Sequence, residues 1–111
     1  MRVIADAARY TPPERGEANH WIVHLNSDHL SLGTYSIPAG GLDDQTPHTE
    51  DEIYLVQAGQ ATLVTTSGIV DVGPGSVVFV PAGEAHRFTE VLVDLAVVVV
   101  FAPPYGSLAG R

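Results

Sequence analysis

Short apolar runs, many of them β-branched, alternate along the chain with clusters of Gly, Pro, Asn and Asp, and no segment shows a convincing helical period. In residues 30–37, for example, Leu30, Leu32 and Thr34 alternate with polar or small residues, as in a strand with one buried face. The pattern predicts strands over residues 21–25, 30–37, 53–57, 60–66, 69–72, 76–80, 86–89 and 92–101. Short strands at such regular spacing are typical of an antiparallel β-sandwich or barrel.

The chain is short enough to form one domain, which we expect to span residues 1–111. The irregular residues 1–18 predict an N-terminal arm, and residues 103–111 predict a C-terminal tail. Residues 97–100 are continuously apolar, which suits a strand buried on both faces. An open edge there would promote aggregation, so barrel closure or a partner subunit should cover it, and we expect a homodimer.

Composition narrows the classes of function. Thirteen acidic residues stand against five arginines and no lysine, and the net charge of −8 argues against nucleic acid and anionic membranes as partners. The absence of cysteine excludes disulfides and thiolate metal sites and fits a cytoplasmic location. The richness in Ala, Val and Gly without Lys hints at a GC-rich bacterial genome.

Two histidine-centred blocks, each bracketed by turn residues, are the main candidates for chemistry. The first block consists of Gly40, Thr46, His48, Glu52 and Gly59, and the second of Gly75, Pro81, Gly83, His86 and Glu90. In an extended chain His48, Glu50 and Glu52 point to the same side. Two imidazoles and a carboxylate on adjoining strands are a ligand set for a divalent metal. The alternative for either histidine alone is a surface residue beside a solvated acidic run.

The spacing of these residues resembles the two motifs of the cupin superfamily, G-x5-H-x-H-x3,4-E-x6-G and G-x5-P-x-G-x2-H-x3-N. The spacings are intact, and the short stretch between the motifs resembles that of small single-domain bacterial cupins. Two positions depart from the pattern: Thr46 replaces the first motif histidine, and Glu90 replaces the asparagine. The resemblance implies an all-β, antiparallel double-stranded β-helix, or jelly-roll barrel.

The resemblance also implies a metal ion inside the barrel, with His48, Glu52 and His86 as its ligands. Thr46 is a poor ligand, so the usual set of four falls to three. Two histidines and one carboxylate suffice for Fe(II) with open positions or for a catalytic zinc. Gln45 or Glu50 could add a fourth oxygen. The cofactor expected is one divalent transition metal, Fe, Mn, Ni or Zn, and a metal-free barrel stays open as the alternative.

Three functions compete on these grounds. The first is a metalloenzyme that catalyses dioxygenation or isomerisation of a small metabolite, with Glu50 as a candidate general base. The second is a non-catalytic barrel that binds or senses a small ligand without metal, and the third is a structural dimerisation domain.

Five aromatic residues are interpreted mainly as core or interface rather than as ligand contacts: Trp21, Tyr35, Tyr54, Phe79 and Phe88. Tyr54 shares the parity of Glu52, so it is also a weaker candidate for lining the pocket.

Overall fold

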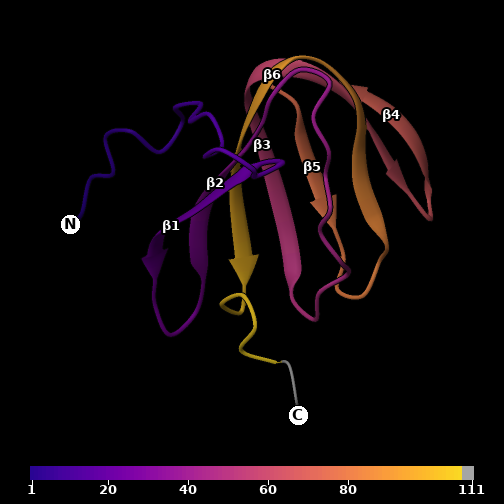
Figure 1. The fold of residues 1–111 in the computed structure, drawn as a ribbon. Coiled ribbons are helices and arrows are strands. Elements are labelled where there is room, and N and C mark those ends of the chain that lie inside the picture. The colour runs from indigo at the N-terminus through magenta and orange to yellow at the C-terminus, as the bar shows by residue number, and fades with distance from the viewer. Residues whose placement is uncertain (109–111) are drawn as a thin grey trace.

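Only β-strands form regular elements in this computed structural model, which describes residues 1–108 (Figure 1). The strands are β1 (His20–Asn26), β2 (Ser31–Ile37), β3 (Asp51–Thr65), β4 (Gly68–Val72), β5 (Val77–Val80) and β6 (His86–Ala102). Every pairing between them is antiparallel. The predicted all-β, antiparallel class is therefore confirmed. Over residues 1–108 there is no helix with the length and apolar character needed to cross a membrane.

The two long strands, β3 and β6, pair along most of their length and hold the fold together. The strand order is β1-β2-β6-β3-β4, and β5 pairs with the first part of β3. The end of β6 lies between β2 and the start of β3, whereas the end of β3 lies between β4 and the start of β6. Both strands curve over the top of the molecule, so the sheet folds back on itself as a jelly roll (Figure 1).

Two of the breaks predicted between strands were wrong. Residues 53–57 and 60–66 belong to the single strand β3, and residues 86–89 and 92–101 belong to β6. Gly59 and Glu90 do adopt the left-handed conformation that usually marks a turn, with φ of 91° and 48°. Here that conformation is taken up inside long strands, and the register of β3 against β6 shifts around Gly59. Such bulges bend a strand without ending it, which lets β3 serve both halves of the sheet.

The hydrophobic core lies between the two halves of the folded sheet. It is built from alternate residues of the strands, as the pleat requires. The buried cluster comprises Tyr35, Ile37, Tyr54, Val56, Ala61, Leu63, Val72, Val80, Phe88, Val91, Leu95, Val97, Val99 and Phe101. Of residues 97–100, predicted to be buried on both faces, residues 97–99 are buried and Val100 is half-buried.

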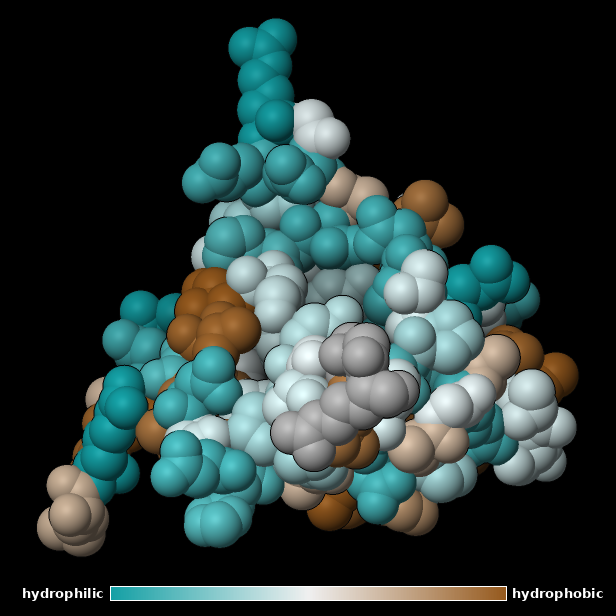
Figure 2. Space-filling view, turned by 90° about the horizontal axis from the view of Figure 1, so that it is seen from below, coloured by the Kyte–Doolittle hydropathy of each residue, from teal (hydrophilic) through white to brown (hydrophobic). Residues whose placement is uncertain are grey.

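The segments outside the strands pack against the sheet. Before β1, Thr11 N donates a 3.1 Å hydrogen bond to Ser36 Oγ, and Thr34 Oγ1 donates to the Ala7 carbonyl. After β6, a turn over residues 104–108 is held by a 3.0 Å bond from Tyr105 N to Ser31 Oγ. The predicted tail of residues 103–111 extends beyond the described range. Figure 2 views the end of the molecule where β6 finishes; hydrophilic residues dominate it, with hydrophobic side chains in separate patches.

Candidate metal centre

The two histidine blocks meet because their turns are hydrogen-bonded to each other. Gly83 N donates a 2.8 Å bond to the His48 carbonyl, and Ala82 N donates a 2.9 Å bond to Asp51 Oδ1. His48 lies in the loop before β3, Glu52 is the second residue of β3, and His86 begins β6. The tight turn at 81–84 thus brings the side chain of His86 to that of Glu52, although the start of β6 pairs with the end of β3.

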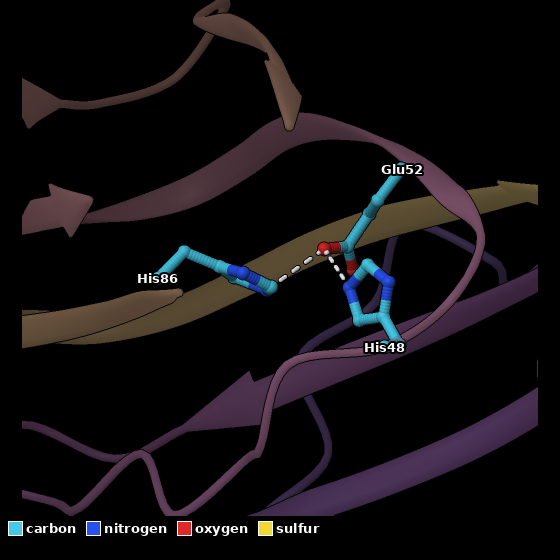
Figure 3. A group of neighbouring side chains, drawn as sticks. All are labelled: His48, Glu52 and His86. Carbon is cyan, nitrogen blue, oxygen red and sulfur yellow. Dashed lines mark hydrogen bonds and ion pairs between the residues drawn. The ribbon is translucent and has the colours of Figure 1, made fainter. Parts of the chain in front are cut away.

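The three residues that the sequence indicated as ligands converge on one point (Figure 3). His48 Nε2 lies 2.9 Å from Glu52 Oε1, and His86 Nε2 lies 3.0 Å from the same oxygen. All three side chains are buried, and their potential ligand atoms lie within 4.8 Å of one another. Two imidazoles and a carboxylate with this geometry form a ligand set for a transition metal.

Hydrogen bonds at the Nδ1 atoms of the two histidines orient their Nε2 atoms toward this point. His48 Nδ1 lies 2.9 Å from the Glu50 carbonyl, and His86 Nδ1 lies 2.8 Å from the Glu84 carbonyl. Because a carbonyl only accepts, each Nδ1 carries the proton, and in a neutral ring Nε2 presents its lone pair to the site. A backbone carbonyl that fixes the tautomer in this way is the usual outer partner of a metal-bound histidine.

Without a cation this arrangement has an unsatisfied atom. Glu52 Oε1 only accepts when it is ionised, and two neutral Nε2 atoms facing it would also be acceptors. His86 Nε2 is buried and has no well-aligned hydrogen-bond partner, although Glu52 Oε1 is close. Either a proton on an imidazole or a divalent metal ion satisfies the group. The residues present therefore fit a metal ion.

The electrostatics of the group agree with this description. Burial by itself would raise the pKa of Glu52, but the neighbouring His48 and His86 outweigh it and hold that pKa below its usual range. Burial would lower the pKa of His86, yet the contacts with Glu52 and with the Glu84 carbonyl raise it. Glu52 is thus a carboxylate that positive charge at the site stabilises.

No fourth protein ligand joins the group among residues 1–108. Thr46 is exposed, and Gln45 Nε2 donates to Asp43 Oδ2 at 2.8 Å and to the Tyr54 hydroxyl at 2.9 Å. Tyr54 is fully buried in the core, where its ring lies 6.0 Å from that of His86. A metal ion here would keep positions open for water or for a ligand.

Glu50 is also buried, but the structure does not bring its carboxylate into the group of three. Its Oε2 accepts from Leu108 N at 3.3 Å and from Thr49 Oγ1, and its Oε1 is buried without a partner. Burial alone would raise the pKa of Glu50, but these hydrogen bonds and one from the Gly106 backbone lower it. Glu50 therefore contacts the C-terminal turn.

Asp43 is a buried residue that the sequence analysis missed. It accepts hydrogen bonds from the Tyr35 hydroxyl and from Phe88 N, both at 2.8 Å, and from Gln45. Burial, followed by the charge of Asp43, raises the pKa of Tyr35 far above its usual value. The carboxylate thus holds the irregular loop before His48 against β2 and β6. No local pattern signals this role, because its partners lie elsewhere in the chain.

A pocket of about 180 Å³ lies beside Glu52. Its walls come from β1 and the residue before it, β2, β3, β6, the loop before His48 and the C-terminal turn. They consist of Asn19, Trp21, Tyr35, Asp44, Gln45, Glu52, Val99, Phe101 and Tyr105. Trp21 and Tyr35, interpreted from the sequence mainly as core or interface residues, therefore line the space next to the candidate metal centre. Periodicity alone could not have shown this, because the pocket joins six separate segments.

Sequence comparison places the chain among known domains. A family model described as "Cupin domain" matches residues 33–101. An uncharacterised protein of Streptomyces coelicolor is 43% identical over 84 residues, which cover 76% of this chain and 80% of that protein.

Solved structures of similar shape agree on the fold. An uncharacterised conserved protein with a double-stranded β-helix domain from Klebsiella pneumoniae has a TM-score of 0.76 and 17% identity, over 93% of this chain and 90% of that one. The DMSP lyase DddQ from Ruegeria pomeroyi has a TM-score of 0.74 and 22% identity; the match covers 99% of this chain but 57% of DddQ. At such identities the likeness shows the double-stranded β-helix fold.

Proposed function

This chain belongs to the cupin domain family, and from that premise we propose that it is a small-molecule metalloprotein with one divalent transition metal inside the barrel. His48, Glu52 and His86 would hold the ion. The observation that supports this most directly is the pair of buried Nε2 atoms, both within 3.0 Å of one carboxylate oxygen, with both Nδ1 protons held by backbone carbonyls.

The proposed activity is a metal-dependent dioxygenation or isomerisation of a small metabolite. A bound Fe, Mn, Ni or Zn ion polarises a substrate oxygen, and a redox-active one also activates O2. The protein's own residues would fix the ion, keep positions open where Thr46 supplies no ligand, and present the neighbouring pocket to a substrate. Glu50 as general base is part of this proposal, and it requires the carboxylate to turn from Leu108 N toward the substrate. Glu50→Gln is then expected to abolish turnover and to leave metal content unchanged.

The deciding experiment is metal analysis of protein purified without an affinity tag or chelator. We expect close to one transition metal per chain in the wild type and a loss of it in His48→Gln and in His86→Gln. His29→Gln is the matched control, because His29 is exposed and lies outside the group. Circular dichroism of each variant shows whether it is folded.

The second candidate function is a metal-free barrel that binds a small ligand, and the missing fourth ligand at Thr46 favours it. A folded wild-type protein that contains no metal, even after anaerobic addition of Fe(II), would disprove the metalloprotein and leave this alternative. Retention of metal in both His48→Gln and His86→Gln would place the ion elsewhere.

We also propose a cytoplasmic location, in line with the lack of cysteine, and a homodimer. Supporting the dimer, Phe79 and Val77 on β5 are 60% and 67% exposed and lie beside Ile53 of β3, which is 39% exposed. These side chains form an apolar patch at the edge of the sheet. Light scattering at micromolar concentration should give twice the chain mass. Phe79→Asp should give the monomer, but Leu92→Asp, at an exposed residue of β6 outside the patch, should not.

A further inference from the structure

The pocket beside Glu52 has aromatic side chains on several sides. Trp21 lies 6.3 Å from Tyr35 and 6.2 Å from Phe101 between ring centroids, with interplanar angles of 82° and 80°. The Tyr105 ring lies 4.8 Å from that of Phe101. Rings that meet nearly at right angles form adjacent walls of a box, so a ligand in the pocket contacts several of them.

The backbone is shaped to keep Trp21 in this box. A Cβ atom on Gly33 would lie 2.4 Å from Trp21 Cη2, so the indole occupies the space that any larger residue would fill. Gly33 is paired with Val23 across β1 and β2. Glycine is therefore required here by the close approach of the indole.

The polar lining of the pocket is acidic. It comprises the carboxylates of Asp44 and Glu52 and the amides of Asn19 and Gln45, and none of the lining residues is Arg or Lys. Asn19 Nδ2 donates a 2.9 Å bond to Asp44 Oδ1, which holds that carboxylate in place. Aromatic walls and carboxylates without a cationic side chain favour a positively charged ligand over an anion.

The size of the pocket limits the ligand. A pocket of about 180 Å³ is large enough for the head group of one small organic cation. Because Glu52 belongs both to this pocket and to the candidate metal centre, one end of the ligand would face that centre.

We propose that the pocket binds a small alkylammonium compound, with its cationic head against Trp21, Phe101 and Tyr105 and near Asp44. An oxygen at the other end of the same ligand faces the centre formed by His48, Glu52 and His86. The contact of that oxygen with a metal rests on the function proposed above, whereas the recognition of the cation does not. Quaternary ammonium groups bind to such aromatic boxes through cation–π attraction.

The probe is choline, compared with its neutral isostere 3,3-dimethyl-1-butanol, in which carbon replaces the charged nitrogen. Trp21 is the single tryptophan of the chain, so its fluorescence reports occupation of the pocket directly, and calorimetry gives the affinity. We expect choline to bind at least about tenfold more tightly than the isostere. Equal affinity for the two probes, or no response to choline, would overturn the proposal.

Two variants test the residues themselves. Tyr105→Leu removes a ring that is 54% exposed, and Asp44→Asn removes one charge; each should weaken choline binding about three- to tenfold and leave the affinity for the isostere nearly unchanged. Tyr10→Leu, which removes a half-buried ring before β1, and Asp28→Asn are matched controls outside this pocket and should bind choline as the wild type does. If the controls lose as much affinity as the pocket variants, choline binds elsewhere and the proposal is wrong.

The same titrations with chelator-treated and metal-loaded protein separate this proposal from the metal centre. Preference for choline over the isostere in both samples supports cation binding in the pocket beside Glu52, whether or not metal analysis supports the metalloprotein. A metal content of one ion per chain without any preference for choline would support the metal centre and disprove the binding of an alkylammonium ligand in the pocket.

Discussion

The imidazole rings of His48 and His86 lie with their centroids 4.9 Å apart and 68° between their planes, although one comes from a loop and the other from the start of β6. Both Nε2 atoms face Glu52 Oε1, so this carboxylate is the shared partner of the two histidines. Its replacement should change metal binding without altering the shape of the site.

The first prediction concerns Glu52→Gln, which keeps the side-chain shape and removes the charge. For the wild type, a metal at one hundred times its dissociation constant should raise the free energy of unfolding by about 2.7 kcal/mol. The variant should show little of this increase, because a neutral amide is a much weaker ligand than a carboxylate. Urea denaturation with and without Zn²⁺ or Mn²⁺ measures this increase in the free energy of unfolding. Glu17→Gln on the exposed N-terminal segment is the control, and equal stabilisation of Glu52→Gln and wild type would contradict the prediction.

The second prediction concerns the bend of β3. Gly59 has a φ of +91°, and a Cβ atom there would lie 2.3 Å from the Asp94 carbonyl oxygen and 2.6 Å from Leu95 Cα. Gly75 has the same φ, with nothing within 4 Å of its Cβ position. Both Gly→Ala changes carry the left-handed penalty of about 1–2 kcal/mol, but Gly59→Ala adds a backbone clash of about 1–3 kcal/mol. The melting temperature of Gly59→Ala should therefore lie well below that of Gly75→Ala. Equal decreases in melting temperature would show that β3 and β6 separate freely at this point.

The strands could be predicted from the sequence, but their continuity could not. Alternation of apolar and polar residues is local, so it marks where β3 and β6 run. Whether a residue such as Gly59 ends a strand or bends it depends on a partner backbone, here Asp94 and Leu95, which lies far along the chain. A left-handed residue therefore predicts a change of direction without saying whether pairing continues beyond it.

The third prediction follows from Glu90, the one residue other than glycine among residues 1–108 with a positive φ, at 48°. It stands where the cupin motif has asparagine, which tolerates the left-handed region better than glutamate does. Glu90→Asn should raise the free energy of unfolding by about 0.5–1 kcal/mol, and Glu90→Gly should also be tolerated. Glu90→Ala is the control, because alanine lacks that tolerance. Chemical denaturation of the variants tests this, and a gain from Glu90→Ala as large as that from Glu90→Asn would assign the effect to removal of charge.

The candidate site was predictable only in part. The spacing of His48, Glu52 and His86 pointed to a common ligand set, since turn residues at fixed offsets place His48 just before β3, Glu52 at its start and His86 at the start of β6. Trp21 and Tyr105 come from opposite ends of the chain and line one pocket only because each ring packs against Phe101 near the end of β6. Asp43 binds Phe88 N and the Tyr35 hydroxyl, contacts that no local pattern records.

The fourth prediction concerns Glu50 as an anchor of the C-terminal turn. Its Oε2 accepts from Leu108 N, and the same turn carries Tyr105 at the pocket. A hydrogen bond to a charged acceptor contributes about 1.5–3 kcal/mol, so Glu50→Ala should speed amide exchange at Leu108 and Gly106 by about ten- to a hundredfold. Glu17→Ala should leave exchange in the turn unchanged.

Metal analysis of the same Glu50→Ala protein separates this role from that of a ligand. Since Glu50 lies outside the group formed by His48, Glu52 and His86, its removal should leave the metal content at the wild-type level. Faster exchange at Leu108 with unchanged metal would establish the anchor. Unchanged exchange would show that the turn is held by other contacts, such as the bond from Tyr105 N to Ser31 Oγ. Loss of metal would instead make Glu50 the fourth oxygen ligand, which requires its carboxylate to turn from Leu108 toward Glu52 when the ion binds.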